Sequence, residues 1–373
     1  MRIYFVSDSI YPYNKGGKEK RLYELSTRLA SMGHDVHICT MHWWKSLDKH
    51  RVENGVTLHS ISRNYDMYSS NRRSIKQGLL FGLACFKLLG KKFDVIDVDH
   101  MPFFPIFSTW LVCVLMHKKL YATWHEALKR SDWIDYMGIS GNVAALIERI
   151  SIRLPYRITA TSTQTAALIK SELKRSTKVS MVPSGVDIKL IAGVKPSKVH
   201  CDVLYVGRLV KNKNVDLLIR AVQIMSIKKT DVKCIIIGSG IEKLHLTKLI
   251  SELNLSNNVR ILDPLPTAEA IYSYMKAAKV FCLPSSREGF GIVALEALAC
   301  GIPVVTVDSP ANATKNLVRL FVNSSVVRID EYDLAEKLYS WINLKKQLYT
   351  SSNILANYDW DMLATQQIKV YKL

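Results

Sequence analysis

Ser285-Ser-Arg-Glu-Gly-Phe-Gly-Ile-Val-Ala-Leu-Glu-Ala-Leu-Ala-Cys-Gly-Ile-Pro-Val-Val305 is the stretch that decides the fold. The apolar run Val280–Pro284 before it has strand character, Ile292–Ala299 has the apolar pattern of a helix, and Pro303–Val307 is β-rich again. A strand, a glycine turn, a helix and a second strand form the repeating unit of a parallel α/β sheet. The sequence therefore predicts such a sheet around this stretch.

The same alternation continues outward from this stretch through the second half of the chain. The predicted strands are Asp202–Val206, Cys234–Gly238 and Val259–Leu262, and the predicted helices are Val215–Met225, Leu244–Leu253 and Ala268–Ala277. Continuous apolar strands between helices are typical of a doubly wound parallel sheet that is buried on both faces. We expect one such domain at 186–357.

The first half of the chain repeats the pattern. Its predicted strands are Arg2–Val6, Val36–Thr40, Val95–Val98, Lys119–Thr123, Ile158–Ser162 and Lys178–Val182, and its predicted helices include Glu19–Met32 and Phe103–Met116. The turn-forming Pro183-Ser184-Gly185 separates the two halves. The chain of 373 residues is long enough for two domains at about 150 residues each. We predict an α/β protein with two Rossmann-like domains, the first at 1–183.

The chain is strongly basic, with a formal net charge of +19. Residues 1–185 carry +12 and residues 186–373 carry +7. Such a surface attracts phosphate groups, as in a nucleic acid, an anionic lipid or a phosphorylated ligand. The balance of 22 % charged and 48 % hydrophobic residues is that of a globular protein and excludes a disordered chain.

The seven cysteines lie mostly in apolar runs, and no two have the C-x-x-C spacing. A zinc or redox site is therefore not expected, and the cysteines are interpreted as small core residues in a reducing compartment. The N-terminal apolar run is too short for a signal peptide. The apolar window Met101–Leu115 is shorter than a membrane span and is interpreted as a buried helix, with a membrane-dipping helix as the alternative. We expect a cytoplasmic protein.

Two carboxylates mark the deciding stretch as a ligand site. Glu288 follows a strand end, and Gly289-Phe290-Gly291 allows backbone N–H groups to approach a ligand closely. The N-terminus of the next helix favours a phosphate. Glu296 lies eight residues after Glu288 in an apolar helix, where a carboxylate needs a partner such as sugar hydroxyls.

A group of cations follows another strand end. Gly207 leaves the strand, and Arg208, Lys211 and Lys213 come before the next helix. Two or three cations suit the two charges of a diphosphate, although a basic cluster by itself is a weak motif. In open α/β sheets ligands bind beyond the carboxyl ends of strands, so we expect the site in a cleft where the strand ends of two domains face each other.

The sequence resembles the retaining, nucleotide-sugar-dependent glycosyltransferases of family 4, which have the GT-B architecture. Glu288…Glu296 is similar to the E-x7-E motif of that family, and the match extends to Gly16-Gly17, Val182–Asp187 and Gly207-Arg208…Lys213. The tail 358–373 resembles the final helix of the family, which crosses back to the first domain. The resemblance covers nearly the whole chain.

The resemblance implies roles for particular residues. Arg208 and Lys213 would bind the donor diphosphate, Glu288 would meet the hydroxyls of the transferred sugar, and Glu296 would bind the ribose. Gly17, with Gly16, would lie close to the diphosphate. His125 matches the position of the active-site histidine, so the implied catalytic set is His125, Glu288, Arg208 and Lys213. The backbone amides that would hold sugar and phosphate are those of Gly289, Phe290, Gly291, Ile292 and Val293.

Three features depart from the pattern or compete with it. Asn214 stands where the family commonly has glycine, and Asp308-Ser-Pro-Ala-Asn312 lacks the usual Gly-Gly and the acidic residue after it. The second departure lies in a loop expected to contact the donor sugar or the acceptor, so it affects the predicted substrate specificity and does not affect the predicted fold. Asp97-Val98-Asp99 could bind a metal ion with a nucleotide diphosphate in another glycosyltransferase architecture, but it is interpreted here as a polar loop at a strand end.

The resemblance implies a hexosyltransferase that acts without a metal ion or cofactor. It would move a sugar from a nucleotide-diphosphate sugar to a hydroxyl of a glycan or a lipid-linked acceptor, with retention. The alternative is a non-enzymatic basic protein that binds nucleic acid or an anionic membrane, although no nucleic-acid-binding motif is present.

Membrane docking is also compatible with the enzyme. The apolar segment Gly78–Leu89 could form an interfacial helix at the cytoplasmic face of the membrane. The basic residues that flank it are Arg72, Arg73, Lys76, Lys87, Lys91 and Lys92.

Overall fold

The structure is a computed structural model that describes residues 1–69, 72–172, 178–344 and 352–373. It divides into two compact units. The first contains Met1–Ser184 and Trp360–Leu373, and the second contains Gly185–Asp359. Within the second unit, the residues next to its two boundaries lie side by side, because Val186 pairs with Asp359 in a parallel bridge and its N–H donates to the carbonyl of Tyr358 at 2.8 Å.

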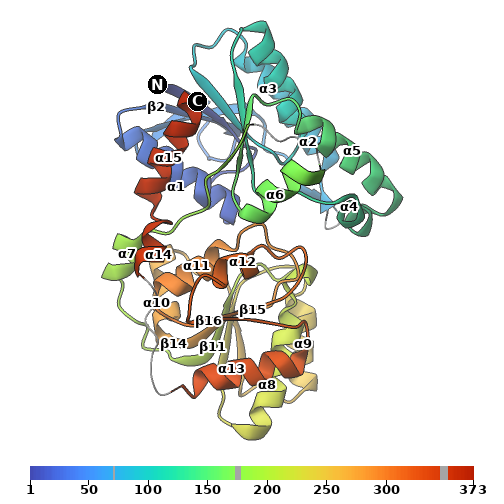
Figure 1. Cartoon of the computed structure of the whole chain (residues 1–373), viewed down its shortest axis with the longest axis vertical. Coiled ribbons are helices and arrows are strands. Elements are labelled where there is room, and N and C mark those ends of the chain that lie inside the picture. The colour runs from blue at the N-terminus through green and yellow to red at the C-terminus, as the bar shows by residue number, and fades with distance from the viewer. Residues whose placement is uncertain (70–71, 173–177, 345–351) are drawn as a thin grey trace. The chain divides into compact units, whose positions relative to one another are not determined.

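A parallel sheet forms the centre of the first unit (Figure 1). In the described residues its strand order is β10-β9-β8-β7-β1-β2-β4-β3. The strands are β1 (Arg2–Val6), β2 (Asp35–Met41), β3 (His50–Glu53), β4 (Val56–Ser62), β7 (Val95–Asp99), β8 (Leu120–Trp124), β9 (Arg157–Ala160) and β10 (Val179–Met181).

Helices accompany this sheet, and a small separate pair of strands lies beside it. The helical elements are α1 (Gly17–Ser31), α2 (Ile75–Ala84), η1 (Cys85–Leu88), α3 (Phe104–Leu115), α4 (Arg130–Met137), η2 (Gly138–Ser140), α5 (Gly141–Ser151), α6 (Thr163–Glu172) and α15 (Trp360–Lys372). The separate pair is β5 (Tyr68–Ser69) and β6 (Arg72–Arg73).

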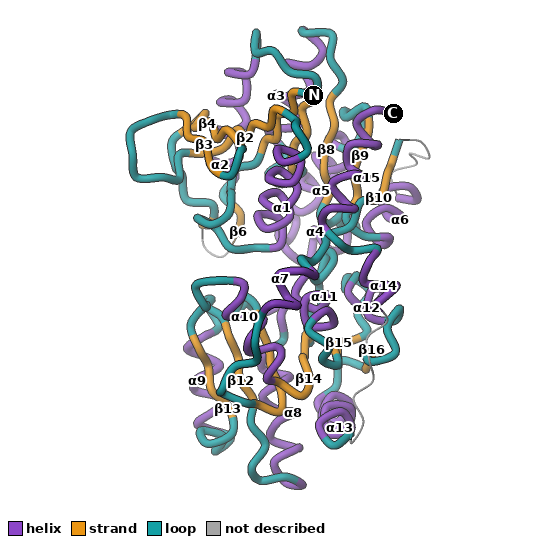
Figure 2. The backbone as a smooth tube through the Cα atoms, turned by 90° about the vertical axis from the view of Figure 1, so that its left-hand side faces the viewer, coloured by secondary structure: helices purple, strands orange, loops and turns teal. Residues whose placement is uncertain are grey.

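The edge of the first sheet departs from the predicted parallel pattern. β3 runs antiparallel to β4, and the two strands are joined by Asn54 (φ 49°) and Gly55 (φ 79°). This is the two-residue Asn-Gly connection that favours a hairpin, because both residues tolerate a positive φ. Figure 2 shows the hairpin of β3 and β4 beside β2.

Helix α15 brings the end of the chain back to the first unit, where it lies beside α1 in both views (Figures 1 and 2). Tyr371 donates its hydroxyl to Asp97 at 2.6 Å, and Gln367 donates to Thr159 at 3.2 Å. Burial raises the pKa of Asp97 to about 6. Asp97 therefore anchors the last helix to the centre of the first sheet.

The second unit is built on a fully parallel sheet with the strand order β13-β12-β11-β14-β15-β16 in the described residues. The strands are β11 (Cys201–Val206), β12 (Cys234–Ile237), β13 (Val259–Leu262), β14 (Ala278–Leu283), β15 (Val304–Val307) and β16 (Ser324–Val327). The helical elements are α7 (Ile188–Gly193), η3 (Lys211–Lys213), α8 (Val215–Lys228), α9 (Lys243–Glu252), α10 (Ala268–Ala277), α11 (Ile292–Ala299), α12 (Thr314–Val318), α13 (Glu331–Ile342) and α14 (Ser352–Ala356).

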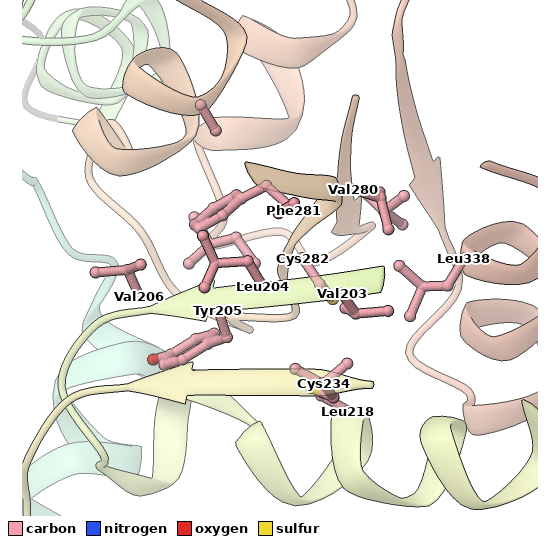
Figure 3. Packing of buried hydrophobic residues seen from close by; sticks show 14 of the residues in the cluster. Val203, Leu204, Tyr205, Val206, Leu218, Cys234, Val280, Phe281, Cys282 and Leu338 are labelled. Atoms are coloured by element: carbon pink, nitrogen blue, oxygen red, sulfur yellow. The ribbon is translucent and has the colours of Figure 1, made fainter. Parts of the chain in front are cut away.

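Central strands of this sheet contribute side chains to the core on both faces, as the alternation of a β-strand requires. Figure 3 shows Leu204 and Tyr205 on opposite sides of β11, and Phe281 of β14 among the same group of packed side chains. All three are fully buried. Most of the cysteines are buried and all are free, as predicted, and burial raises the pKa of Cys39 and Cys201 to about 12.

One prediction about an apolar helix needs correction. The window Met101–Leu115 forms α3, but Trp110, Leu111, Val114 and Leu115 are exposed, so this helix is only half buried. The segment Gly78–Leu89, which was predicted to be amphipathic, falls in α2, η1 and the residue after η1, and it has both buried and exposed apolar side chains. None of the helices in the described part of the chain combines the length and hydropathy that a bilayer crossing requires.

A buried carboxyl ties α4 and α5 to the end of β8. Glu148 is 3 % exposed and accepts hydrogen bonds from the indole N–H groups of Trp133 (2.6 Å) and Trp124 (3.4 Å). Burial raises the pKa of Glu148 from 4.5 to about 7. Between these two values the folded protein keeps a proton that the unfolded chain releases, so its stability falls as the pH rises through this range.

We predict that Glu148→Gln removes this pH dependence. The parent should lose roughly 3 kcal/mol of unfolding free energy between about pH 4.5 and 7, and the variant, whose amide oxygen still accepts from Trp133, should lose much less. Urea unfolding across this pH range measures the difference. Asp135→Asn, on the exposed part of α4, is the control and should keep the slope of the parent. Equal slopes for the Glu148 variant and the parent would contradict the prediction.

Asn214, the residue where glycine was expected, occupies a left-handed conformation (φ 48°, ψ 44°) just before α8. Its side chain donates to the carbonyl of Pro284 at 3.0 Å. Glycine and asparagine both tolerate this region, whereas a residue with an ordinary Cβ is strained there. The departure from the family pattern therefore preserves the backbone conformation.

We predict that Asn214→Ala destabilises the second unit by about 1–2 kcal/mol more than Asn214→Gly, because both variants lose the hydrogen bond but only alanine is strained at positive φ. Calorimetric unfolding of the two variants gives the comparison. If the Asn214→Ala and Asn214→Gly variants unfold at the same temperature, the conformation of residue 214 does not matter to stability.

Candidate donor and acceptor half-sites

The predicted site residues of the second unit follow two neighbouring strands, β11 and β14. In this sheet the strand order reverses there, since β11 pairs with β12 on one side and β14 on the other. The loops that leave the carboxyl ends of such a pair diverge, and the space between them is where open α/β sheets bind ligands. Arg208 and Lys213 follow β11, and Glu288 follows β14.

The structure brings Lys213 and Glu288 together. Lys213 Nζ lies 2.6 Å from Glu288 Oε1, and both side chains are largely buried. The two loops are also joined through the backbone, because the N–H of Ser286 donates to the carbonyl of Asn212 at 3.0 Å. An ammonium group has three N–H donors, so Lys213 can hold Glu288 and still donate to an anion. Arg208 is exposed on the same loop.

Glycines allow the loops of this half-site to approach each other. A Cβ on Gly238, which follows β12, would lie 1.9 Å from the carbonyl oxygen of Gly207. Gly291 has a φ of 82° and begins α11, and a Cβ there would lie 2.0 Å from Thr314 Oγ1. Of the five residues whose backbone amides were predicted to hold the donor, Ile292 and Val293 begin α11, Gly291 is its N-cap, and Gly289 and Phe290 lie in the turn before it.

Glu296 is 5 % exposed inside α11 and accepts a hydrogen bond from the hydroxyl of Tyr272 at 3.0 Å. The carboxylate therefore has a protein partner from α10, which the sequence analysis did not identify. Tyr272 had no signal in the sequence, because it lies on an ordinary amphipathic helix whose distance from Glu296 only the fold determines.

The segment with the unusual sequence Asp308–Asn312 lies against Glu288. The N–H of Glu288 donates to the carbonyl of Ala311 at 3.0 Å, and the N–H of Ala313 donates to the carbonyl of Glu288 at 2.8 Å. Asn312 is fully buried, and its side chain donates to the carbonyl of Val307 at 2.8 Å. The buried amide fixes this loop without the glycine pair, and the loop forms one side of the surroundings of Glu288.

The remaining predicted residues belong to the first unit. Gly16 and Gly17 are exposed at the start of α1, and His125 follows β8. These residues lie at the carboxyl edge of the first sheet, where the strand order reverses between β1 and β7. His125 Nε2 lies 2.8 Å from Asp99 Oδ1, a pairing that the sequence analysis did not predict.

The two carboxyls of Asp97-x-Asp99 are engaged by protein groups. Asp97 holds α15, as described above, and Asp99 faces His125 and Lys18. Among the described residues, no group of three or more histidine, cysteine, aspartate or glutamate side chains is placed to hold a metal ion.

Two family models together match most of the chain. The model described as Glycosyltransferase Family 4 matches residues 15–190, and the model described as Glycosyl transferases group 1 matches residues 196–353. A D-inositol 3-phosphate glycosyltransferase of Pseudarthrobacter chlorophenolicus is 31 % identical over 163 residues, which are 40 % of this chain and 38 % of that protein. The match thus spans well under half the length of this curated relative.

Longer matches have lower identity. The gpi3 subunit of phosphatidylinositol N-acetylglucosaminyltransferase from Schizosaccharomyces pombe is 22 % identical over 98 % of this chain and 79 % of its own length. The structure of Anabaena HepE in complex with UDP aligns over the whole of both chains with a TM-score of 0.77 and 19 % identity, which shows a shared fold. The chain belongs to the group 1, family 4 glycosyltransferases, the retaining family with the GT-B fold.

Proposed function

We propose that this protein transfers a sugar, with retention, from a nucleotide-diphosphate sugar to a hydroxyl of a glycan or lipid-linked acceptor. The observation that carries the proposal is the paired Lys213 and Glu288 where the strand order of the second sheet reverses, directly before the glycine turn and α11. A cation and a helix N-terminus favour binding of a diphosphate, and a carboxylate can accept hydrogen bonds from the hydroxyls of a sugar.

The leaving diphosphate gains charge as the glycosidic bond breaks. Arg208, Lys213 and the N–H groups at the start of α11 would stabilise that charge, and such groups accelerate a reaction because they bind the transition state more strongly than the ground state. Glu288 would accept hydrogen bonds from the hydroxyls of a hexosyl group. We propose that these cations serve in place of a metal ion. The acceptor would attack from the face that the diphosphate leaves, with the leaving phosphate assisting its deprotonation.

His125, Gly16 and Gly17 would contribute to the same reaction from the first unit. Glu296, held by Tyr272, would bind the ribose hydroxyls of the donor. The UDP complex described above is that of Anabaena HepE, another protein of the same fold. A uridine donor is therefore the first to test among the nucleotide sugars.

A lipid-linked acceptor is supported by an apolar surface on the first unit, defined here as the apolar face. It comprises large apolar side chains that are exposed on α2, η1, α3, α4, η2 and α5, with Ile139 the most exposed at 89 %. They are Ile75, Leu79, Leu83, Phe86, Leu89, Trp110, Leu111, Val114, Leu115, Ile134, Ile139, Val143, Leu146 and Ile150. Contacts of α2 with α3 and of α4 with α5 bring these side chains into two groups, and large exposed apolar patches mark interaction sites.

Basic residues accompany the apolar face. Lys76, Lys91 and Lys92 are exposed beside α2 and η1, and Arg149 and Arg153 are exposed at the end of α5. Apolar side chains together with cations suit the surface of an anionic bilayer. The relative from Schizosaccharomyces pombe is named for a phosphatidylinositol acceptor, which is a membrane lipid. We propose that the apolar face docks on a membrane next to a lipid-linked acceptor.

The alternative function, a basic protein that binds nucleic acid or a membrane without catalysis, explains the charge and the apolar face. It gives no role to the pairing of Lys213 with Glu288 or to the Gly207–Gly238 approach. A thermal-shift screen of nucleotide sugars distinguishes the two. A true donor at 100 times its dissociation constant should stabilise the protein by about 2.7 kcal/mol, whereas the alternative predicts no response.

We predict that Glu296→Ala weakens binding of the nucleotide by roughly 1.5–3 kcal/mol, since a charged hydrogen-bond partner of the ribose is lost. Calorimetric titration with the nucleotide identified in the screen, carried out in EDTA, measures this change and also tests binding without a divalent ion. Glu252→Gln, on the exposed part of α9, is the control and should bind as the parent does. Unchanged affinity of the Glu296 variant would remove Glu296 from the site.

We predict that the protein sediments with anionic but not with neutral liposomes at low salt. Two of the predicted basic residues are left out of the test variant: Arg73 is paired with Asp8 at 2.6 Å, and the side chain of Arg72 lies outside the described part of the structure. Replacing Lys76, Lys91 and Lys92 with Gln should weaken binding by up to about 3 kcal/mol, at about 1 kcal/mol for each charge. The charge-matched control replaces Lys195, Lys198 and Lys228 of the second unit. Equal binding by both variants would place the docking surface elsewhere.

A further inference from the structure

A chain of alternating charges runs along the carboxyl edge of the first sheet. His125 Nε2 lies 2.8 Å from Asp99 Oδ1, and Asp99 Oδ2 lies 3.8 Å from Lys18 Nζ. Lys18 Nζ then lies 2.7 Å from Asp8 Oδ1, and the other oxygen of Asp8 lies 2.6 Å from Arg73. Of these five charged side chains, the proposed function uses only His125.

These charged side chains come from separate parts of the first unit. Asp8 follows β1, Asp99 ends β7, His125 follows β8, and Lys18 lies in the first turn of α1 directly after Gly16-Gly17. Asp8 is completely buried and Asp99 is 9 % exposed. Buried charges persist only when they are paired, so these ion pairs fix the elements that carry them relative to one another.

The neighbouring charged side chains keep Asp99 in its ionised form. Burial alone would raise the pKa of Asp99, but Lys18 and His125 hold it well below its usual range. Burial alone would lower the pKa of Lys18, but the carboxylates of Asp8 and Asp99 raise it. An ionised Asp99 can only accept a hydrogen bond, so the nitrogen that faces it, His125 Nε2, must carry a proton.

We propose that Asp99 is a positioning residue of the transfer site, which holds His125 as the Nε2–H tautomer and so makes Nδ1 the acceptor nitrogen toward a substrate hydroxyl. Lys18 supports this arrangement and links it to the Gly16-Gly17 loop. The proposal rests on the proposed function, since His125 acts on a substrate only if the protein is a transferase. A histidine whose second nitrogen is held by a carboxylate has a fixed tautomer and ring orientation.

The first sheet contains a second pair of this kind, which supplies a matched control. His37 Nε2 lies 2.9 Å from Asp35 Oδ1 at the start of β2, at the opposite edge of the sheet from the predicted site residues. The side chain of Asp35 is 48 % exposed. Asp35→Asn therefore makes the same chemical change to an aspartate–histidine pair that the proposal does not place in the site.

The test is a double-mutant cycle with transfer kinetics. We expect Asp99→Asn to lower kcat at least 10-fold and to change the KM of the nucleotide sugar less than 2-fold, whereas Asp35→Asn leaves both near the parent values. In the His125→Ala background, Asp99→Asn should cost less than 2-fold. An equal loss in both backgrounds would overturn the proposal, because Asp99 would then act independently of His125.

A second measurement needs no activity. Selective ¹⁵N-histidine labelling, with the His125→Ala spectrum for assignment, reports the tautomer in the parent protein. We expect the Nε2–H tautomer at His125, and an Nδ1–H tautomer would overturn the proposal whatever the kinetics show. The proposed function fails separately, as an absence of transfer from every nucleotide sugar tested.

Discussion

The reversal of strand order at the centre of each sheet is the constraint on which the rest of this structure depends. In the second sheet β11 lies between β12 and β14, and in the first sheet β1 lies between β2 and β7. Chain connections on the two sides of such a strand run in opposite directions, so the loops at its carboxyl end diverge and leave room for a ligand. The loops that follow β11 and β14 carry Lys213 and Glu288. In the first sheet Asp8 follows β1, and Asp99 is the last residue of β7.

Partly buried charges at these edges are held in pairs. Lys213 with Glu288 in the second unit and Lys18 with Asp8 in the first are close contacts between side chains that solvent barely reaches. Removing one partner of such a pair leaves an uncompensated charge, which costs far more than the intact pair contributes. The pairs therefore fix the positions of the loops more than they stabilise the fold.

Close approach of the backbone is the second requirement of the second unit. Gly238 and Gly291 stand where a Cβ would meet a carbonyl oxygen or a threonine side chain within about 2 Å. Asn214 satisfies a related demand, since its left-handed conformation excludes most other residues. The backbone geometry of the loops thus restricts their sequences independently of any ligand chemistry.

The sequence alone determined the alternation of strands and helices and the candidate residues of the second unit, because apolar period, glycine turns and the Glu288–Glu296 spacing are local properties of the chain. It did not reveal the β3–β4 hairpin, although Asn54-Gly55 is a recognisable signal for one. The exposed apolar side of α3 was also missed, since apolar composition does not tell which face of a helix is covered. Only the tertiary structure joined Tyr272 to Glu296 and Asp99 to His125, because each pair comes from elements whose separation in space depends on strand order and not on sequence distance.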